Sequence, residues 1–199
     1  MLFSGLFLLV TTFIPVVTGQ APGDPLDPIN RFHAGLIEMM KQPGYAEKNS
    51  SLRPIVADTF DTATVARIAL GRNWRKLPET DQNTLSNLMA EVIVSSYASR
   101  FPEYENQQFT VIGEKPMKSN RTIIRTRMLT TAETVELDYQ LVALEGQWKI
   151  FDVVANGVSD LSLKRATYSA TFKSSGFNGV IEEIKQTIHD NKTRAIVDC

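Results

Sequence analysis

The chain has 199 residues, of which 43% are hydrophobic, 9% aromatic and 22% charged, as in an ordinary soluble domain large enough to bury a core. Its 21 Lys and Arg residues balance 22 Asp and Glu residues, so the formal net charge is -1. This balance excludes the strong basic excess of a general nucleic-acid-binding protein. The only cysteine is the last residue, Cys199, so the sequence contains no pair that could form an internal disulfide.

The first segment differs from this average. Residues 2–17 carry no charge and are rich in Leu, Phe and Val, and small residues followed by a loop rich in Pro and Gly come after them. The apolar run is short for a membrane-spanning helix and is typical of a secretory signal. No Lys or Arg precedes it, which leaves a retained membrane anchor as the alternative. We expect a signal peptide at residues 1–20 and a single domain at residues 21–199.

Three- and four-residue spacing of apolar side chains predicts a first helix that begins with Asp27 as its cap and ends at Pro43. A second helix is predicted from about Asp61 to Leu70, with Gly71 as the stop signal. A third begins after Pro78 and ends before residue 102. The same period returns in residues 162–174 and 178–192. The apolar stripe of the first helix consists of Ile29, Phe32, His33, Leu36, Ile37 and Met40.

Between these helices the period changes to two, which predicts strands at residues 109–112, 122–129, 135–144 and 148–154. In the third strand, apolar Leu137, Tyr139 and Leu141 alternate with polar residues, so one face of the sheet meets water. The order of elements predicts the α+β class, with a four-stranded antiparallel curved sheet covered by several helices. Incomplete packing between sheet and helices would enclose an apolar cavity.

The search for catalytic chemistry finds little. His33 lies on the apolar stripe and His189 in a terminal helix, and two separated histidines with one cysteine make a metal cage implausible. Asp138 and Asp152 lie on neighbouring predicted strands, where a buried carboxylate facing a pocket can act as a general base. Arg125 and its neighbours on the preceding strand are natural cross-strand partners, so a solvated ion pair is the simpler interpretation for Asp138.

Two stretches of the sequence resemble the MlaC family, also called the toluene-tolerance family, of periplasmic phospholipid-binding proteins. The first runs from Phe60-Asp61 through Ala69-Leu70-Gly71-Arg72-Asn73-Trp74-Arg75 to Ser95-Ser96-Tyr97. The second is Trp148-Lys149-Ile150-Phe151-Asp152-Val153 with Gly157-Val158-Ser159 and, further on, Gly176-Phe177. The resemblance covers about residues 28–190. The segment from Asp160 to Tyr168 departs from the family's usual pattern and is similar to the hopanoid-associated branch, called HpnM.

The resemblance implies a carrier that shuttles a hopanoid or a phospholipid between the inner and outer membranes, and not an enzyme. It implies no cofactor, and as partners an inner-membrane lipid transporter or exporter and an outer-membrane lipoprotein complex. The strand around Trp148 also resembles the nuclear-transport-factor-2-like fold, which hosts enzymes as well as carriers, so a small-molecule enzyme with a pocket Asp as base is the alternative function. The expected cavity-lining residues are Leu88, Val92, Ile124, Leu137, Tyr139, Leu141, Leu161 and Tyr168.

Overall fold

A computed structural model describes residues 22–197 of the chain, so the expected signal peptide and Cys199 lie outside the described residues. Helices and one long antiparallel meander alternate along the chain in the order expected for an α+β protein. The elements are α1 (Leu26–Met40), α2 (Tyr45–Thr59), α3 (Thr62–Leu70), the 3-10 helix η1 (Gly71–Lys76), α4 (Glu79–Arg100), β1 (Gln108–Met117), β2 (Arg121–Leu129), β3 (Thr134–Leu144), β4 (Gln147–Ala155), β5 (Val158–Ser159) and α5 (Asp160–Val197).

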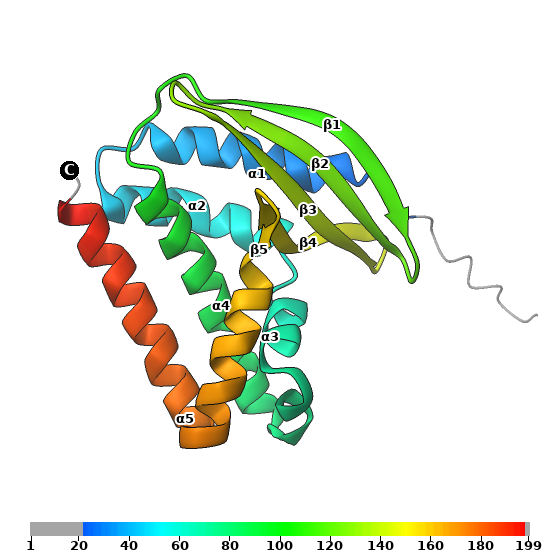
Figure 1. The fold of residues 1–199 in the computed structure, drawn as a ribbon, viewed down its shortest axis with the longest axis vertical. Coiled ribbons are helices and arrows are strands. Elements are labelled where there is room, and N and C mark those ends of the chain that lie inside the picture. The colour runs from blue at the N-terminus through cyan, green and yellow to red at the C-terminus, as the bar shows by residue number, and fades with distance from the viewer. Residues whose placement is uncertain (1–21, 198–199) are drawn as a thin grey trace, which may run out of the picture.

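The sheet has the strand order β1-β2-β3-β4-β5, with every neighbouring pair antiparallel. The four predicted strands are present and the sheet is curved (Figure 1). The predicted count of four is wrong, because the two residues of β5 add a fifth strand to the edge of β4. Asn156 and Gly157 connect these strands with φ values of 48° and 82°, which is the backbone of a two-residue hairpin too short for a hydrophobic period to reveal.

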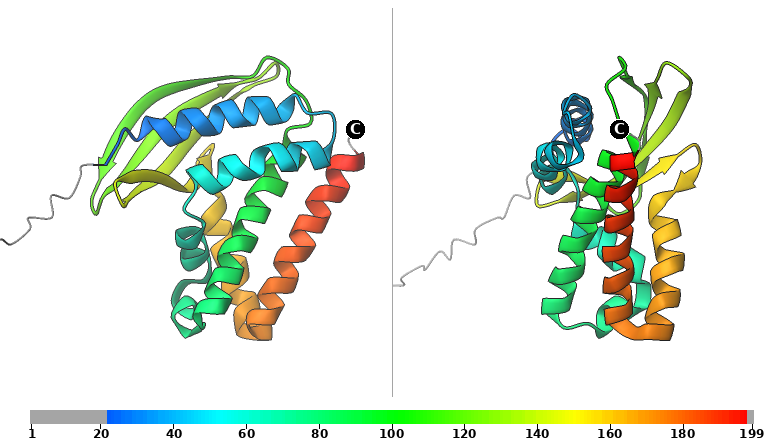
Figure 2. Two further views of the ribbon diagram at one scale, coloured as in Figure 1. Left: turned by 180° about the vertical axis from the view of Figure 1, so that it is seen from behind. Right: turned by 90° about the vertical axis from the view of Figure 1, so that its left-hand side faces the viewer.

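Helix α1 crosses one face of the sheet, and α2 lies beside it (Figures 1 and 2). Helix α1 begins one residue before the predicted cap, since the Asp24 carboxylate accepts a hydrogen bond from the Leu26 N–H at 2.8 Å. The assignment of Asp27 as the cap is therefore wrong. The predicted stripe is correct: Ile29, Phe32 and Leu36 are buried against the sheet.

Helix α2 was not predicted. Its sequence is mainly polar and contains Pro54, whose ring removes one backbone hydrogen bond from a helix interior. Its buried residues are four or fewer positions apart, and the buried Lys48 is one of them. The Lys48 ammonium donates hydrogen bonds to the carbonyl oxygens of Phe101 and Pro102, where α4 ends. Tertiary contacts therefore stabilise a helix that the apolar pattern alone does not specify.

The remaining helices form a bundle below the sheet, in which α3 and α5 pack on α4 (Figure 2). The predicted helix from about Asp61 to Leu70 is present as α3, and the Asp61 carboxylate caps it by accepting a hydrogen bond from the Thr64 N–H at 3.0 Å. Helix α5 is divided at Gly176, which has φ 68° and ψ -164°, so its two halves lie side by side as an antiparallel pair. Among residues 22–197, no helix is both long and apolar enough to cross a bilayer.

Two groups of buried side chains form the core. The sheet cluster lies between α1, α2, α4 and the sheet, and the helix cluster lies between α3, α4, α5 and Phe151 of β4. Phe32 is central to the sheet cluster, with its ring centroid 5.0 Å from that of Phe60 and 5.1 Å from that of Tyr97, both edge to face. The α+β class and the antiparallel meander are thus confirmed, and the likeness to the nuclear-transport-factor-2-like fold stays a prediction.

His33 is buried beside the sheet cluster, where it contacts Tyr139 and Phe109. Its Nε2 is hydrogen-bonded to the Tyr139 hydroxyl at 3.0 Å, and its ring stacks on Phe109 at 4.0 Å. Burial lowers the pKa of His33 from 6.5 to about 4. The imidazole is therefore neutral in the folded protein at neutral pH.

This pKa predicts an acid-dependent loss of stability. Between about pH 6.5 and pH 4 the unfolded chain protonates this imidazole and the folded protein does not, so stability falls as the pH falls. We expect His33→Phe, which keeps a stacked ring, to remove this contribution of roughly 3 kcal/mol. Urea unfolding of the wild type and of His33→Phe from pH 7 to pH 4 measures this contribution to the free energy of unfolding. A wild-type-minus-variant difference that does not change with pH would contradict the prediction.

Candidate functional site

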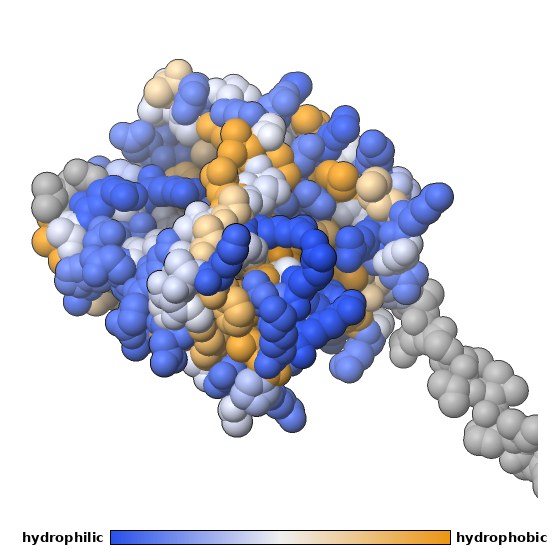
Figure 3. Space-filling model, turned by 60° about the horizontal axis from the view of Figure 1, so that its bottom comes forward, coloured by the Kyte–Doolittle hydropathy of each residue, from blue (hydrophilic) through white to orange (hydrophobic). Residues whose placement is uncertain are grey.

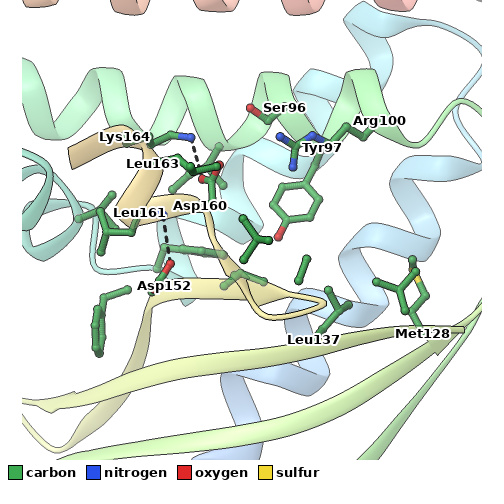
Figure 4. Close-up of a pocket in the computed structure, with 18 of the residues that line it drawn as sticks. Ser96, Tyr97, Arg100, Met128, Leu137, Asp152, Asp160, Leu161, Leu163 and Lys164 are labelled. Carbon is green, nitrogen blue, oxygen red and sulfur yellow. Dashed lines mark hydrogen bonds and ion pairs between the residues drawn. The ribbon is translucent and has the colours of Figure 1, made fainter. Parts of the chain in front are cut away.

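A pocket of about 330 Å³ lies between α4, the ends of β2 to β4, and the start of α5. Its walls are mainly apolar, and Figure 4 shows the side chains converging from the sheet on one side and the helices on the other. It is lined by Phe60, Val65, Ile93, Ser96, Tyr97, Arg100, Phe101, Met128, Val135, Leu137, Phe151, Asp152, Val153, Ala155, Val158, Asp160, Leu161, Leu163 and Lys164.

Helix α4 supplies one wall through residues three or four positions apart: Ile93, Ser96, Tyr97 and Arg100. Figure 4 shows the Tyr97 ring directed toward the pocket, and burial raises the pKa of its hydroxyl, which stays protonated. Phe101 stacks parallel to Tyr97 at 5.9 Å and is held at the helix end by the bonds from Lys48. Tyr97 and Phe101 therefore form one packed surface of this wall.

Strand β4 supplies the opposite wall. Phe60 is held beside it by a parallel bridge to Ile150, and the Asp61 N–H donates to the Ile150 carbonyl oxygen at 2.8 Å. Val153 and Phe151 line the pocket from this strand. Segments 90 residues apart in the chain thus meet at this strand.

The opening of the pocket combines apolar and charged side chains. Val158 and Leu163 line it and are 55% and 59% exposed, so two aliphatic side chains meet solvent at the opening. Lys164 Nζ lies 2.7 Å from the Asp160 carboxylate, whereas Arg100 forms no ion pair within residues 22–197. Figure 3 shows that apolar residues also reach the surface in a narrow band bordered by strongly hydrophilic ones. Such a rim suits a molecule with an apolar body and an anionic end.

The two candidate acids occupy different environments. Asp138 lies on the outer face of the sheet opposite Arg125, with Nε and carboxylate 3.8 Å apart, and the ion-pair interpretation is confirmed. Asp152 is 7% exposed and lines the pocket. Burial raises its pKa, against the opposing effect of hydrogen bonds from Ser159 and the Leu161 N–H.

Asp152 anchors the start of α5. Its carboxylate accepts hydrogen bonds from the Ser159 hydroxyl at 2.7 Å and the Gln140 amide at 3.1 Å. It also accepts one from the Leu161 N–H at 3.2 Å, which Figure 4 shows. A carboxylate at a helix N-terminus also interacts favourably with the helix dipole. These contacts occupy both carboxylate oxygens and explain the residue without a catalytic role.

The structure separates the eight expected cavity residues. Leu137 and Leu161 line the pocket. The other six belong to, or pack against, the two core clusters: Ile124, Tyr139 and Leu141 in the sheet cluster, and Leu88, Val92 and Tyr168 in the helix cluster. Their contact with a lipid stays a prediction. The lining residues that the sequence reasoning missed include Arg100, which continues the three- and four-residue spacing of Ser96 and Tyr97.

No group of three or more His, Cys, Asp or Glu side chains in the described part of the chain could hold a metal ion. The site is thus an apolar pocket with a polar rim on an α+β scaffold, a type of site that binds a ligand of mixed character.

Residues 31–186 match the family model described as MlaC protein. The chain belongs to the MlaC family.

A solved structure supports the same architecture. The fold is similar to that of the phospholipid-binding protein from Ralstonia solanacearum, solved in complex with a phospholipid, with a TM-score of 0.75 and 15% sequence identity. The match covers 85% of this chain and 99% of that chain. At this identity the likeness concerns the fold, and the arrangement of helices on the curved sheet is shared.

The role of Asp152 yields a paired prediction. Asp152→Ala should lower the free energy of unfolding by about 2–3 kcal/mol, because it leaves the Leu161 N–H and the Ser159 hydroxyl without their acceptor. Asp138→Ala removes only an exposed ion pair and should cost less than about 1 kcal/mol. Urea unfolding at pH 7 compares the two variants. Equal losses would show that Asp152 does not anchor α5.

Proposed function

We propose that this protein is a periplasmic carrier that binds a lipid with its hydrocarbon portion in the pocket. The observation that carries the proposal is the pocket itself, apolar inside and bordered by Arg100 and the Lys164–Asp160 ion pair, in a chain of the MlaC family. This family is one of periplasmic lipid-binding proteins. The apolar segment at residues 2–17 supports export, and we propose that it acts as the signal peptide.

The energetics of lipid transfer require enclosure. Exposing a saturated chain of about sixteen carbons to water costs on the order of 12 kcal/mol, at about 0.8 kcal/mol per CH₂. A flat surface leaves much of the chain in water, whereas a pocket between sheet and helices removes it. The aromatic and aliphatic lining from Tyr97, Leu137 and Leu161 suits this role.

The polar end of the lipid would lie at the rim. Arg100 is exposed at the end of α4, whereas Lys164 is paired with Asp160. A guanidinium can bind a phosphate with two parallel hydrogen bonds. We therefore propose Arg100 as the main contact to an anionic head group, with Lys164 as a second contact that exchanges Asp160 for the ligand.

The ligand is a phospholipid or a hopanoid, and the sequence departure at residues 160–168 bears on the choice. That segment starts α5 and includes four pocket-lining residues, Asp160, Leu161, Leu163 and Lys164. A change of pattern in the wall of the pocket supports a change of ligand, which favours the hopanoid. The carrier would exchange lipid with an inner-membrane transporter or exporter and with an outer-membrane lipoprotein complex.

The alternative, a small-molecule enzyme with a pocket Asp as base, rests on Asp152 and its raised pKa. A general base needs an oxygen within reach of a substrate proton. The three donors already bonded to Asp152 favour an anchoring role instead.

Lipid that purifies with the protein is the primary test. The protein should be exported in a Gram-negative host, purified without detergent and analysed by native mass spectrometry and organic extraction. We expect about one lipid per protein. Its head group or polycyclic skeleton would show whether the chain belongs to the phospholipid or the hopanoid branch of the family. A protein that purifies empty and rejects both added phospholipid and added hopanoid would contradict the carrier function.

A matched pair of substitutions on β4 tests whether the lipid binds in the pocket. Val153 lines the pocket, whereas Val154 does not and pairs with Asp138 on the outer face. Overpacking a site costs about 1–3 kcal/mol, which corresponds to roughly a tenfold loss of bound lipid or more. We expect this loss in Val153→Trp and retention within about twofold in Val154→Trp. Equal lipid content in both variants would place the lipid elsewhere.

The head-group assignment is tested separately. Arg100→Gln should weaken binding of phosphatidylglycerol by roughly threefold or more at low salt, since an exposed charge pair contributes up to about 1 kcal/mol. The effect should shrink at about 0.5 M salt because exposed charges are screened. Lys115→Gln removes an exposed cation from β1, outside the pocket, and is the control. A loss of the same size in both variants would indicate nonspecific attraction.

A further inference from the structure

A second pocket, of about 630 Å³, lies beside the connection between β1 and β2 and is called the turn pocket below. Its polar side chains include Lys118 and Ser119 of the connection, Arg121 of β2 and Gln140 of β3. Among the described residues, only Phe151 lines both this pocket and the first one. No Asp or Glu of residues 22–197 lines the turn pocket, so its walls carry two positive charges and no negative one.

The two cations of the turn pocket have no counter-ion. Two other arginines on the same face of β2, Arg125 and Arg127, are paired with acids of β3. Arg121 instead faces the apolar Val142 on that strand. Neither Arg121 nor Lys118 forms an ion pair within residues 22–197. The positive charge at this end of the sheet is therefore available to an anion from outside the protein.

Two carboxylates lie near the turn pocket without lining it. Glu114 pairs with Ile124 of the sheet cluster and so lies on the opposite face of the sheet from Arg121. Asp152 accepts a hydrogen bond from the Gln140 amide, and two further donors already occupy its carboxylate. Neither carboxylate therefore neutralises the cations of this pocket.

The turn between β1 and β2 brings Lys118 and Arg121 together. Ser119 and Asn120 have φ values of 61° and 54°, the left-handed backbone of a tight hairpin turn. The Asn120 carbonyl oxygen accepts a hydrogen bond from the Ala143 N–H at 2.8 Å, which joins the turn to β3. The backbone thus holds the two cations on either side of one short turn.

The Phe151 ring orients the Arg121 side chain. The Arg121 guanidinium lies over this ring, 5.0 Å from its centroid. Phe151 is 4% exposed and belongs to the helix cluster, so the core holds the ring in place. A guanidinium that stacks on an aromatic ring uses its face and leaves its N–H donors free at the edge. Arg121 is accordingly directed for hydrogen bonding to a ligand in the turn pocket.

Two cations beside a hydroxyl suit a phosphate group. A phosphate monoester carries a charge of about -1.5 to -2 at neutral pH and presents three strong acceptor oxygens. A guanidinium binds two such oxygens through parallel hydrogen bonds, and a lysine ammonium adds a point charge. The Ser119 hydroxyl, on the same turn, supplies a further donor.

We propose that the turn pocket is a phosphate-binding site in which Arg121 and Lys118 bind the phosphate group of a free phosphate or of a lipid head group. This site goes beyond the proposed carrier function, because its lining differs from that of the first pocket. It does not depend on which lipid the first pocket holds.

The test titrates inorganic phosphate into the exported protein and follows backbone amide shifts by NMR. Arg121→Gln and Lys118→Gln each remove one cation of the site. Arg125→Gln removes an equal charge from the same face of β2, outside both pockets, and is the matched control. We expect saturable shifts centred on residues 118–121. Binding should be weaker by about threefold or more in the first two variants and within about twofold of wild type in the control.

A second measurement identifies the source of the phosphate. Wild type, Arg121→Gln and Arg125→Gln are sedimented with phosphatidylcholine vesicles that contain or lack phosphatidic acid. Co-sedimentation that requires phosphatidic acid and is lost in Arg121→Gln alone supports the site and assigns it to a lipid head group. Saturable binding of inorganic phosphate, with equal co-sedimentation of all three proteins, supports the site and assigns it to a free phosphate.

Two results would overturn the phosphate site. The first is a wild-type protein that binds neither inorganic phosphate nor the vesicles with phosphatidic acid. The second is an equal loss of binding in Arg121→Gln and Arg125→Gln, which would indicate general attraction to a positive surface. Arg121 and Lys118 are exposed and outside both core clusters, so their variants should unfold at the wild-type urea concentration. Either result leaves the carrier function intact, since the lipid content of the purified protein tests that function.

Discussion

The bulge at Phe151 is the constraint on which the arrangement of this protein depends. Ile150 and Phe151 face opposite sides of β4, so this strand packs against both the sheet cluster and the helix cluster, and the extra residue shifts the register so that Asp152 pairs with Gln140. The next residue, Asp152, then accepts hydrogen bonds from Ser159 and from the Leu161 N–H. The bulge thereby fixes where α5 begins, and the pocket forms in the angle between β4 and that helix.

The pocket is stabilised by groups that do not line it. Lys48 holds the end of α4 through two carbonyl oxygens, and Asn191 of α5 donates to the hydroxyls of Ser95 and Ser96 at 3.0 and 3.2 Å. Buried polar groups with partners of this kind make a packing arrangement specific, because leaving them unpaired is costly. The apolar lining can then stay incompletely filled without collapse of the surrounding helices. Such a division of roles suits a protein that binds a water-insoluble ligand and releases it again.

The prediction from sequence was accurate where a segment has one apolar face. Helices α1, α3 and α4 and strands β2, β3 and β4 appear near their expected bounds, because burial of one face imposes a period of 3.6 or 2. Strand β1 extends five residues beyond the predicted end at residue 112, because its mostly exposed side chains carry no such period. Helix α2 was missed, since Pro54 and a mainly polar sequence hide a helix whose stability comes from its neighbours. Of the eight expected cavity residues, Leu137 and Leu161 line the pocket; an apolar residue in a core and one in a pocket wall give the same signal.

The sequence by itself determined the α+β class, the antiparallel meander, the outward ion pair of Asp138 and the resemblance to the MlaC family, which the family match bears out. These follow from local periodicity and from motifs that lie close together in the chain. Only the tertiary structure decided that Asp152 is an anchor, that Arg100 lies at the rim and that Phe151 lines two pockets. Each of these depends on contacts between segments far apart in sequence, whose distances no local pattern encodes.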